Sequence, residues 1–566
     1  GPGGKRDQTH NMADERLPRG MAQRLPTDIL CELFEVSANL EPFLAHRSAF
    51  NYAADMAIES DNLYPDDFHT QPGDLGWIRL THVCNLWRTV GVELCPRLWA
   101  DLNILAIPYD TLDLILSRAG DLPLRASAGI WQSERYFERD LSLVKKFMPR
   151  LRELDISYPD RWLYQLRGFL FTLEGQTRQI PILERLEKLV CWPHAYYLEA
   201  PPQDCALNAP NLRHCTMSDP YMPISAPRLT HFWMNYTYWE GLPRHPASLN
   251  SKSQDGLDTL LRNLRSMPKL EVLELRLPLT RSRITSGTDL SAPLLLPHLR
   301  RLRLAGNITN CAELLPIISS SSESRVSVQL DTSIQPHAGD SRLYSSLFQS
   351  ILPRVWDSKH GALVLQPTQE LPTRAPGNMP GPHIGFGLIR REDTVDSPGD
   401  IRVSVTPYNN LAAMPVSWQR REVAAAFFNT IKTAYNVLDI SRCDLWQELA
   451  PAIPDGVLDS VHTLKTDLVH CGFLRYAVCT RDRPLLPALR QVILVEGLDH
   501  PSEEQWKTGW DSLNGALRQY RRGGKPLTVR RAKRSGNSFS ALDKYGEVDR
   551  EGLRRARELA LNVLEE

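Results

Sequence analysis

Residues 268–276 read Pro268-Lys269-Leu270-Glu271-Val272-Leu273-Glu274-Leu275-Arg276. Successive side chains of a β-strand point to opposite faces, so Leu273 and Leu275 share one face of such a strand. Glu274 and Arg276 then share the other face. The stretch therefore predicts a strand with one buried face and one solvent-exposed face.

The same arrangement recurs along the chain. A proline is followed by an apolar residue at the second place, by another three places later and by a third two places beyond that. Further copies begin at Pro149, Pro210, Pro227, Pro297 and Pro487, and Leu186, Leu189 and Cys191 fit the frame without a proline. Apolar helical stripes, for example at 257–264 and 343–352, lie between copies. A strand and a helix cannot bury their apolar faces alone, so the units must stack.

This repetition predicts an α/β fold, an irregular leucine-rich-repeat-like solenoid over residues 102–520. A non-repeating α/β domain with amphipathic strands is the alternative, because the spacing between copies varies. Prolines and glycines concentrate near 367–399, which predicts an insertion across the solenoid. Ser502-Glu503-Glu504-Gln505 has the form of a capping box and predicts a helix start.

The two ends of the chain differ from this pattern. Residues 1–20 lack an apolar stripe and predict a disordered N-terminus. Residues 521–566 begin with a basic run and predict a basic tail followed by a C-terminal helix. Between the N-terminus and the repeats, Leu98 to Ile107 alternates as a strand would, and Tyr109 to Arg118 predicts a helix.

The amino-acid composition limits the kinds of partner that we expect. Lys plus Arg and Asp plus Glu both number 66 in 566 residues, and this balance gives no reason to expect nucleic acid or an anionic membrane as partner. The 10 cysteines are scattered singly, and no apolar run resembles a signal peptide or a membrane span. We expect a protein of the cytoplasm, the nucleus or both.

Two apolar runs stand before the repeats. Arg24-Leu25-Pro26-Thr27-Asp28-Ile29-Leu30-Cys31-Glu32-Leu33-Phe34 predicts an amphipathic helix with Pro26 in its first turn. In the second run, Trp77 to Arg88, the residues Trp77, Leu80, Cys84 and Trp87 lie at helical intervals. The segment Cys95-Pro96-Arg97-Leu98-Trp99 follows it. Two helices this small cannot hide so many apolar side chains from water.

The order Leu-Pro, Val-Cys, Trp-Arg and Leu-Trp resembles the F-box of mushroom-forming fungi, here at residues 21–101 with an acidic insertion at 41–74. The resemblance implies docking on a Skp-type adaptor and, through it, on a cullin. The adaptor-binding residues that it implies are Leu25, Pro26, Ile29, Leu30, Leu33, Phe34, Leu80, Val83, Cys84 and Trp87. A plain helical hairpin that starts a globular domain is the alternative.

Residues with catalytic or metal-binding chemistry do not form a motif. Gly385-Phe386-Gly387 lacks the third glycine of a nucleotide-binding loop. Cys191, His194, Cys205, His214 and Cys215 lack the paired spacing of a zinc site, and two of the cysteines fall in apolar strand positions. We therefore expect no catalytic residue, no metal and no cofactor.

The sequence thus predicts a non-enzymatic substrate receptor of an SCF-type ubiquitin ligase. The F-box would bind the adaptor and the solenoid would bind an unknown target protein. Target contacts are expected on the exposed strand positions Trp233, Arg276, Arg301 and Arg303, where the arginines favour an acidic or phosphorylated segment. A leucine-rich-repeat scaffold without a ligase role is one alternative function, and a hydrolase-like enzyme in the degenerate repeats is another.

Overall fold

The computed structural model of the chain describes twenty stretches. They are residues 24–41, 75–128, 134–156, 182–191, 207–217, 224–235, 260–277, 293–306, 308–320, 325–331, 340–355, 360–366, 384–390, 401–406, 416–430, 436–440, 450–479, 484–495, 502–531 and 546–565. The chain divides into two compact units, residues 1–158 with 183–188, and residues 159–182 with 189–566. These bounds differ from the expected boundary at residue 101. The expected disordered N-terminus and most of the 41–74 insertion lie outside the described residues.

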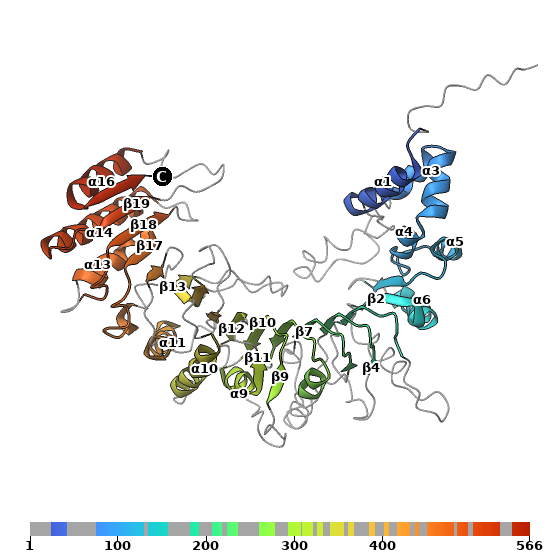
Figure 1. Cartoon of the computed structure of the whole chain (residues 1–566), viewed down its shortest axis with the longest axis horizontal. Coiled ribbons are helices and arrows are strands. Elements are labelled where there is room, and N and C mark those ends of the chain that lie inside the picture. Colours follow the sequence, from blue (N-terminus) through green and yellow to red (C-terminus); the bar gives the residue numbers. More distant parts are fainter. Residues whose placement is uncertain are drawn as a thin grey trace, which may run out of the picture. The chain divides into compact units, whose positions relative to one another are not determined.

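The first unit begins with helices and ends with two parallel strands (Figure 1). Its elements are α1 (Thr27–Leu40), η3 (Gly76–His82), α3 (Asn85–Thr89), η4 (Val90–Leu94), α4 (Pro96–Ala100), α5 (Tyr109–Ala119), β1 (Leu124–Ala128), α6 (Glu134–Phe147), η5 (Met148–Arg150) and β2 (Leu151–Ile156). The helix expected near Tyr109 is confirmed as α5.

Two sequence predictions for this unit are wrong. Trp77 to Arg88 is not one helix, because Cys84 is extended (φ −161°, ψ 173°) and separates the 3₁₀-helix η3 from α3. Leu98 to Ile107 is not a strand. Its first residues close α4, and only Asn103 makes a β-bridge, to Arg125 of β1.

The second unit is a mixed α/β structure built on one large sheet. Its first strands are β3 (Lys188–Cys191), β5 (His214–Met217), β7 (His231–Asn235), β8 (Val272–Arg276), β10 (Arg301–Gly306) and β12 (Arg325–Asp331), and each of the pairs β5/β7, β7/β8, β8/β10 and β10/β12 is parallel. Short strands form two parallel pairs, β4 (Leu207–Asn208) with β6 (Ile224–Ser225) and β9 (Leu294–Leu296) with β11 (Ile318–Ser320).

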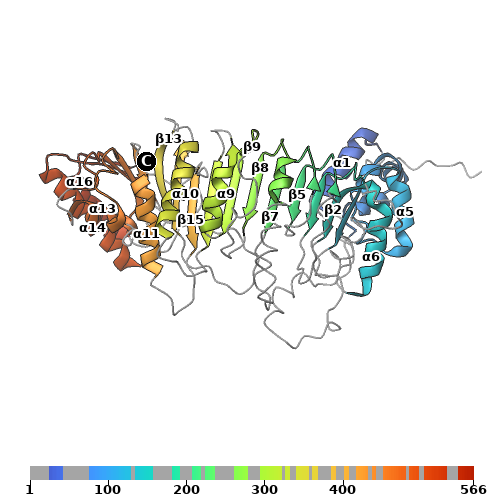
Figure 2. The same ribbon diagram turned by 90° about the horizontal axis from the view of Figure 1, so that it is seen from below.

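The sheet continues to the end of the chain. The remaining elements are α9 (Ile308–Ile317), α10 (Asp340–Val355), β13 (His360–Gln366), β14 (Ile384–Arg390), β15 (Ile401–Thr406), α11 (Val416–Thr430), β16 (Val437–Asp439), η7 (Ala450–Ala452), β17 (Thr463–Asp467), η8 (Val469–Cys471), α13 (Gly472–Cys479), β18 (Gln491–Val495), α14 (Glu503–Arg522), β19 (Thr528–Arg531), α16 (Gly546–Leu559) and β20 (Asn562–Glu565). In Figure 2 the helices α9, α10, α11, α13, α14 and α16 lie along the same face of this sheet.

A turn explains the repeated proline. Leu212, Leu229, Leu270, Leu299 and Leu489 each donate their backbone N–H to the carbonyl three residues earlier, at 3.0–3.2 Å. The proline then occupies the second position of a four-residue turn, where its fixed φ is favoured and its missing N–H costs nothing. Each proline therefore sets the turn that leads into a strand.

The repeat positions predicted to face inward are buried. Leu273 and Leu275 of β8 are 0% and 2% exposed, and the equivalent residues of the other copies are also buried: Leu151, Leu154, Ile156, Leu186, Leu189, Cys191, Leu212, Cys215, Met217, Leu229, Phe232, Met234, Leu299, Leu302, Leu304, Leu489, Val492 and Leu494. At about 25 cal/mol per Å² of buried apolar surface, burial of these side chains stabilises the strands of each unit. The predicted strands are confirmed as parallel members of the two units.

The proline- and glycine-rich region near 367–399 is more than an insertion. Its described part is β14, which pairs antiparallel with β13 and with β15. The spatial order is β12, β15, β14, β13, β16. After β12 the chain therefore forms β13 three positions away, and β14 and then β15 occupy the two positions between them. The sheet is thereby continuous although one strand is inverted.

The C-terminal region is also part of the sheet, so the expected basic tail is corrected. Arg521 and Arg522 end α14, and β19 and β20 add parallel strands after β18. The capping box predicted at Ser502 is present, with Ser502 and Gln505 bonding each other's backbone N–H.

A buried carboxylate ties the last helices together. Asp549 of α16 is 5% exposed and accepts from the indole Nε1 of Trp506 at 3.3 Å and of Trp510 at 3.1 Å. Arg531 of β19 forms an ion pair with the same carboxylate at 2.8 Å. Three elements, α14, β19 and α16, therefore meet at one side chain.

Candidate functional site

Aromatic packing holds the helical segment of the first unit. The rings of Phe34 and Trp77 meet edge-on with centroids 6.1 Å apart, and those of Trp77 and Trp99 do so at 5.0 Å. Trp99 also donates from Nε1 to the carbonyl of Gly91 at 2.7 Å. A Cβ on Gly91 would lie 2.7 Å from the Phe34 ring, so this contact requires glycine. These contacts give α1, η3, η4 and α4 fixed positions.

The predicted adaptor-binding residues fall into three groups. Leu30, Phe34 and Trp87 are 0%, 0% and 9% exposed and form the core of the segment. Leu25, Leu33, Leu80 and Cys84 are half-buried. Pro26, Ile29 and Val83 are exposed, the last two at 40% and 50%. Only the second and third groups can touch a partner directly, and the first group supports them.

Further apolar residues of the same elements, which the sequence prediction did not include, are also exposed. Val36 and Leu40 of α1 are 47% and 76% exposed, and Leu86 and Leu94 are 36% and 54% exposed. Ile29, Leu33, Val36 and Leu40 recur at intervals of four, three and four residues, so they share one face of α1. This spacing could have been read from the sequence. The run that resembles the F-box ends at Phe34, so Val36 and Leu40 were not included in the prediction.

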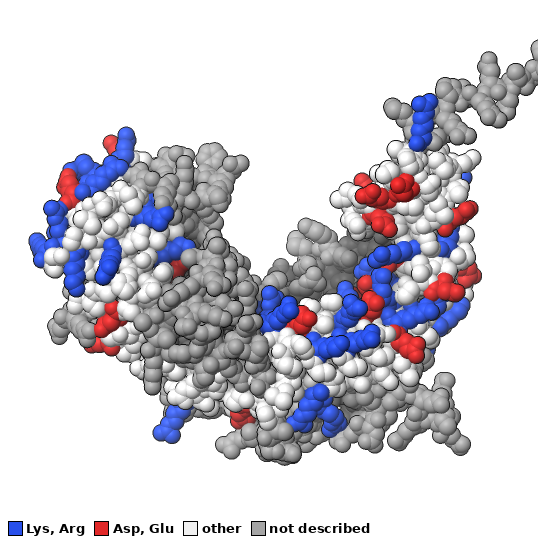
Figure 3. Space-filling model, viewed as in Figure 1, with Lys and Arg blue, Asp and Glu red and all other residues white. Residues whose placement is uncertain are grey.

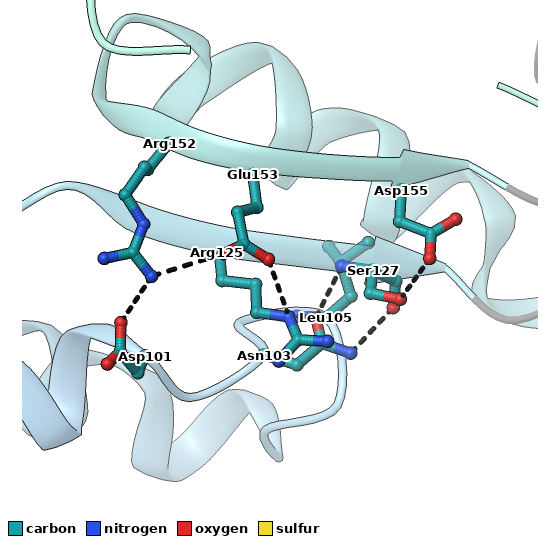
Figure 4. Close-up of polar contacts among 8 residues, drawn as sticks. All are labelled: Asp101, Asn103, Leu105, Arg125, Ser127, Arg152, Glu153 and Asp155. Carbon is teal, nitrogen blue, oxygen red and sulfur yellow. Dashed lines mark hydrogen bonds and ion pairs between the residues drawn. The ribbon is translucent and has the colours of Figure 1, made fainter. Parts of the chain in front are cut away.

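Asn103 connects the helical segment to the sheet (Figure 4). Its amide Nδ2 donates to the Ser127 carbonyl at 2.7 Å, and its Oδ1 accepts from the backbone N–H of Ser127 at 2.8 Å and of Leu105 at 3.2 Å. The Ile104 N–H donates to the carbonyl of Arg125 at 3.0 Å. The Asn103 side chain therefore makes hydrogen bonds to the backbone of β1 like those that a neighbouring strand would make.

Charged side chains continue this connection on the solvent face of the same two strands. Arg152 of β2 forms an ion pair with Asp101, which follows α4, at 2.7 Å. Glu153 pairs with Arg152 at 3.4 Å and with Arg125 at 3.5 Å. Figure 4 shows these side chains turned toward one another. Because the charges balance within the cluster, we interpret it as a structural junction between helices and strands, not as a ligand site.

The residues predicted to bind the target lie on one face of neighbouring strands. Trp233 of β7, Glu274 of β8 and Arg303 of β10 are register partners, and so are Val272 with Arg301 and Arg276 with Ala305. Arg301 is exposed, and Trp233, Arg276 and Arg303 are half-buried. Arg303 pairs with Glu274 at 3.9 Å, a contact that the sequence prediction missed. Next to this group, the rings of His214 and His231 stack with centroids 4.5 Å apart.

The cysteines behave as apolar residues. Burial raises the pKa of Cys215 and of Cys311 to about 12. Burial, with a hydrogen bond to Cys31, raises the pKa of Cys95 to about 12. Cys191 and Cys215 lie in inward strand positions, as expected, and His194 and Cys205 lie outside the described residues. Within the described stretches, no group of three or more His, Cys, Asp or Glu side chains is placed to hold a metal ion.

Comparisons with known proteins do not identify the function of this chain. No family model matches the chain, and no curated protein matches it. Among solved structures, the leucine-rich repeat-containing protein LegL7 from Legionella pneumophila is similar at 12% identity, over 62% of this chain and 91% of that one, with a TM-score of 0.24. At this TM-score the similarity supports no functional conclusion. None of the helices in the described stretches is both long and apolar enough to cross a membrane.

Proposed function

We propose that this protein is the substrate-receptor subunit of an SCF-type cullin-RING ubiquitin ligase. The helical segment is an F-box that binds a Skp-type adaptor, and the leucine-rich-repeat-like solenoid binds a target protein. Catalysis belongs to other subunits of the complex. Holding both partners on one chain raises the effective concentration of the target near the ubiquitin-conjugating enzyme.

The observation that carries the proposal is the set of apolar side chains that the described residues leave exposed around an aromatic core. Ile29, Val36, Val83 and Leu86 are each at least 36% exposed. They lie within or beside the sequence runs that resemble the F-box. Several large apolar side chains that a small module leaves exposed to water commonly mark a protein interface. The order Leu25-Pro26, Val83-Cys84, Trp87-Arg88 and Leu98-Trp99 supports the adaptor as the partner.

Binding to a purified fungal Skp-type adaptor tests this function. Ile29→Asp and Val83→Asp should each weaken the complex about tenfold or more, because truncation or charging of a central interface residue costs about 1–3 kcal/mol. Leu25→Ala/Pro26→Ala should do the same while the protein stays folded. Leu114→Asp is the matched control, since Leu114 is 51% exposed on α5 and lies outside both runs.

Size-exclusion chromatography and calorimetry with each variant measure these affinities. If the unaltered protein forms no complex with the adaptor, the ligase function is wrong, and a repeat scaffold without a ligase role becomes the better hypothesis. If Leu114→Asp weakens the complex as much as Ile29→Asp, the surface has been placed on the wrong residues.

A further inference from the structure

Positive charge dominates the described residues around β5 to β10. The solvent face of β8 and β10 carries Arg276, Arg301 and Arg303 against Glu274, and Arg300 and Glu271 lie where these two strands begin. Figure 3 shows blue side chains gathered over this part of the sheet with few red ones. A surface with this imbalance attracts negatively charged ligands.

The two acidic residues are already engaged. Glu274 pairs with Arg303 at 3.9 Å on the solvent face of the strands, and Glu271 pairs with Arg300 at 3.9 Å at the edge where the strands begin. Arg276 and Arg301 form no ion pair with a carboxylate of the described residues. They are therefore the cations of this face that can receive an acidic partner, and the Glu274–Arg303 pair between them is neutral.

The sheet register fixes how far apart these two arginines are. Arg301 is level with Val272, whereas Arg276 is level with Ala305, four residues further along the strand direction. At about 3.3 Å per residue along a strand and about 4.8 Å between strands, their Cα atoms are about 14 Å apart. An extended peptide also rises about 3.3 Å per residue, so acidic side chains four positions apart match this separation.

On this basis we propose that the face of β7, β8 and β10 binds an extended acidic segment of the target protein. Two carboxylates four residues apart pair with Arg276 and Arg301, and a neutral residue between them faces the Glu274–Arg303 pair. The half-buried Trp233 ring, level with Glu274, provides apolar contact beside the segment. This inference rests on the proposed function, because it takes the bound ligand to be a protein.

The central ion pair favours a peptide over a nucleic acid. A continuous phosphate chain would bring negative charge against Glu274, whereas a peptide can place a neutral side chain there. Arginine also binds carboxylates through paired, charge-assisted hydrogen bonds, which suits side chains presented one at a time.

Fluorescence anisotropy with labelled peptides tests the proposal on the full chain. One peptide carries two Glu residues four positions apart in a Ser/Thr background, and a second has the same composition with the two Glu residues adjacent. The spaced peptide should bind at least threefold more tightly. Arg276→Glu and Arg301→Glu should each weaken it at least tenfold, while Arg262→Glu, an exposed arginine in the helical residues 260–265, should leave it unchanged.

Equal binding of the two peptides, or an Arg262→Glu effect equal to that of Arg301→Glu, would overturn the proposed spacing and site. Tighter binding of an oligouridine that is lost in the same two variants would assign the face to RNA. Adaptor binding measured on the same samples separates the two ideas. A protein that binds adaptor but neither peptide refutes the acidic segment only, and one that binds the spaced peptide but not adaptor refutes the ligase function.

Discussion

Replacing Asn103 by alanine should loosen the connection between the helical segment and β1. The substitution removes three hydrogen bonds, those to the Ser127 carbonyl, the Ser127 N–H and the Leu105 N–H, at 2.7, 2.8 and 3.2 Å. A net contribution of about 1 kcal/mol for each bond gives about 2–3 kcal/mol for the local opening of this edge. The chain has two units and a long repeat, so local opening is a better observable than one unfolding free energy.

Amide hydrogen exchange measures this opening directly. The Ser127 and Leu105 amides should exchange about thirty to a hundredfold faster in Asn103→Ala, because each tenfold corresponds to about 1.4 kcal/mol. Asn103→Asp keeps an acceptor for the two N–H groups but sets a carboxylate oxygen against the Ser127 carbonyl in place of the amide donor, so it should also speed exchange at Ser127. Amides of β18 in the second unit provide the internal control. If protection at Ser127 is the same in Asn103→Ala as in the unaltered protein, the junction does not depend on this side chain.

Two further predictions concern buried groups. Asp549→Ala should destabilise α16 by about 3–5 kcal/mol, because the Arg531 guanidinium and the indoles of Trp506 and Trp510 lose a shared partner; unchanged hydrogen exchange in α16 would contradict this. Cys95, Cys215 and Cys311, whose pKa values burial raises to about 12, stay protonated as pH rises to 8, so iodoacetamide should label them far more slowly in the native than in the denatured protein. Mass spectrometry of labelled peptides checks this, and equal rates in both states would refute it.

The repeated strand could be predicted because two local signals coincide in it. Alternating apolar residues such as Leu273 and Leu275 specify the buried face, and the proline two residues before Leu270 specifies the turn that precedes the strand. Both signals act over a few residues, so neither depends on the rest of the fold. The capping box at Ser502 is a local signal of the same kind and is also confirmed.

The pairing of distant strands could not be predicted in the same way. The inverted position of β14 depends on partners at β13 and β15, and nothing in residues 384–390 distinguishes an antiparallel from a parallel neighbour. The basic run at the C-terminus was misleading for a related reason. Arg531 lies in a strand because Asp549, eighteen residues later, neutralises its charge inside the fold. Charge alone indicated a solvated tail, and the compensating partner was too far along the chain to be associated with it.

At the candidate site, the helix α1 also shows what the sequence alone could not predict. Leu30 and Phe34 repeat four residues apart, and so do Ile29 and Leu33, so two apolar stripes lie side by side on one helix. The sequence marks both stripes as apolar, and only the contacts with Trp77 and Trp87 decide that the first is buried. Replacing Leu30 or Phe34 should therefore destabilise the segment by about 2–5 kcal/mol, as core truncations do, and the proposed adaptor binding would be lost with the fold. Ile29 and Val83 are consequently the positions at which loss of binding reports on the interface itself.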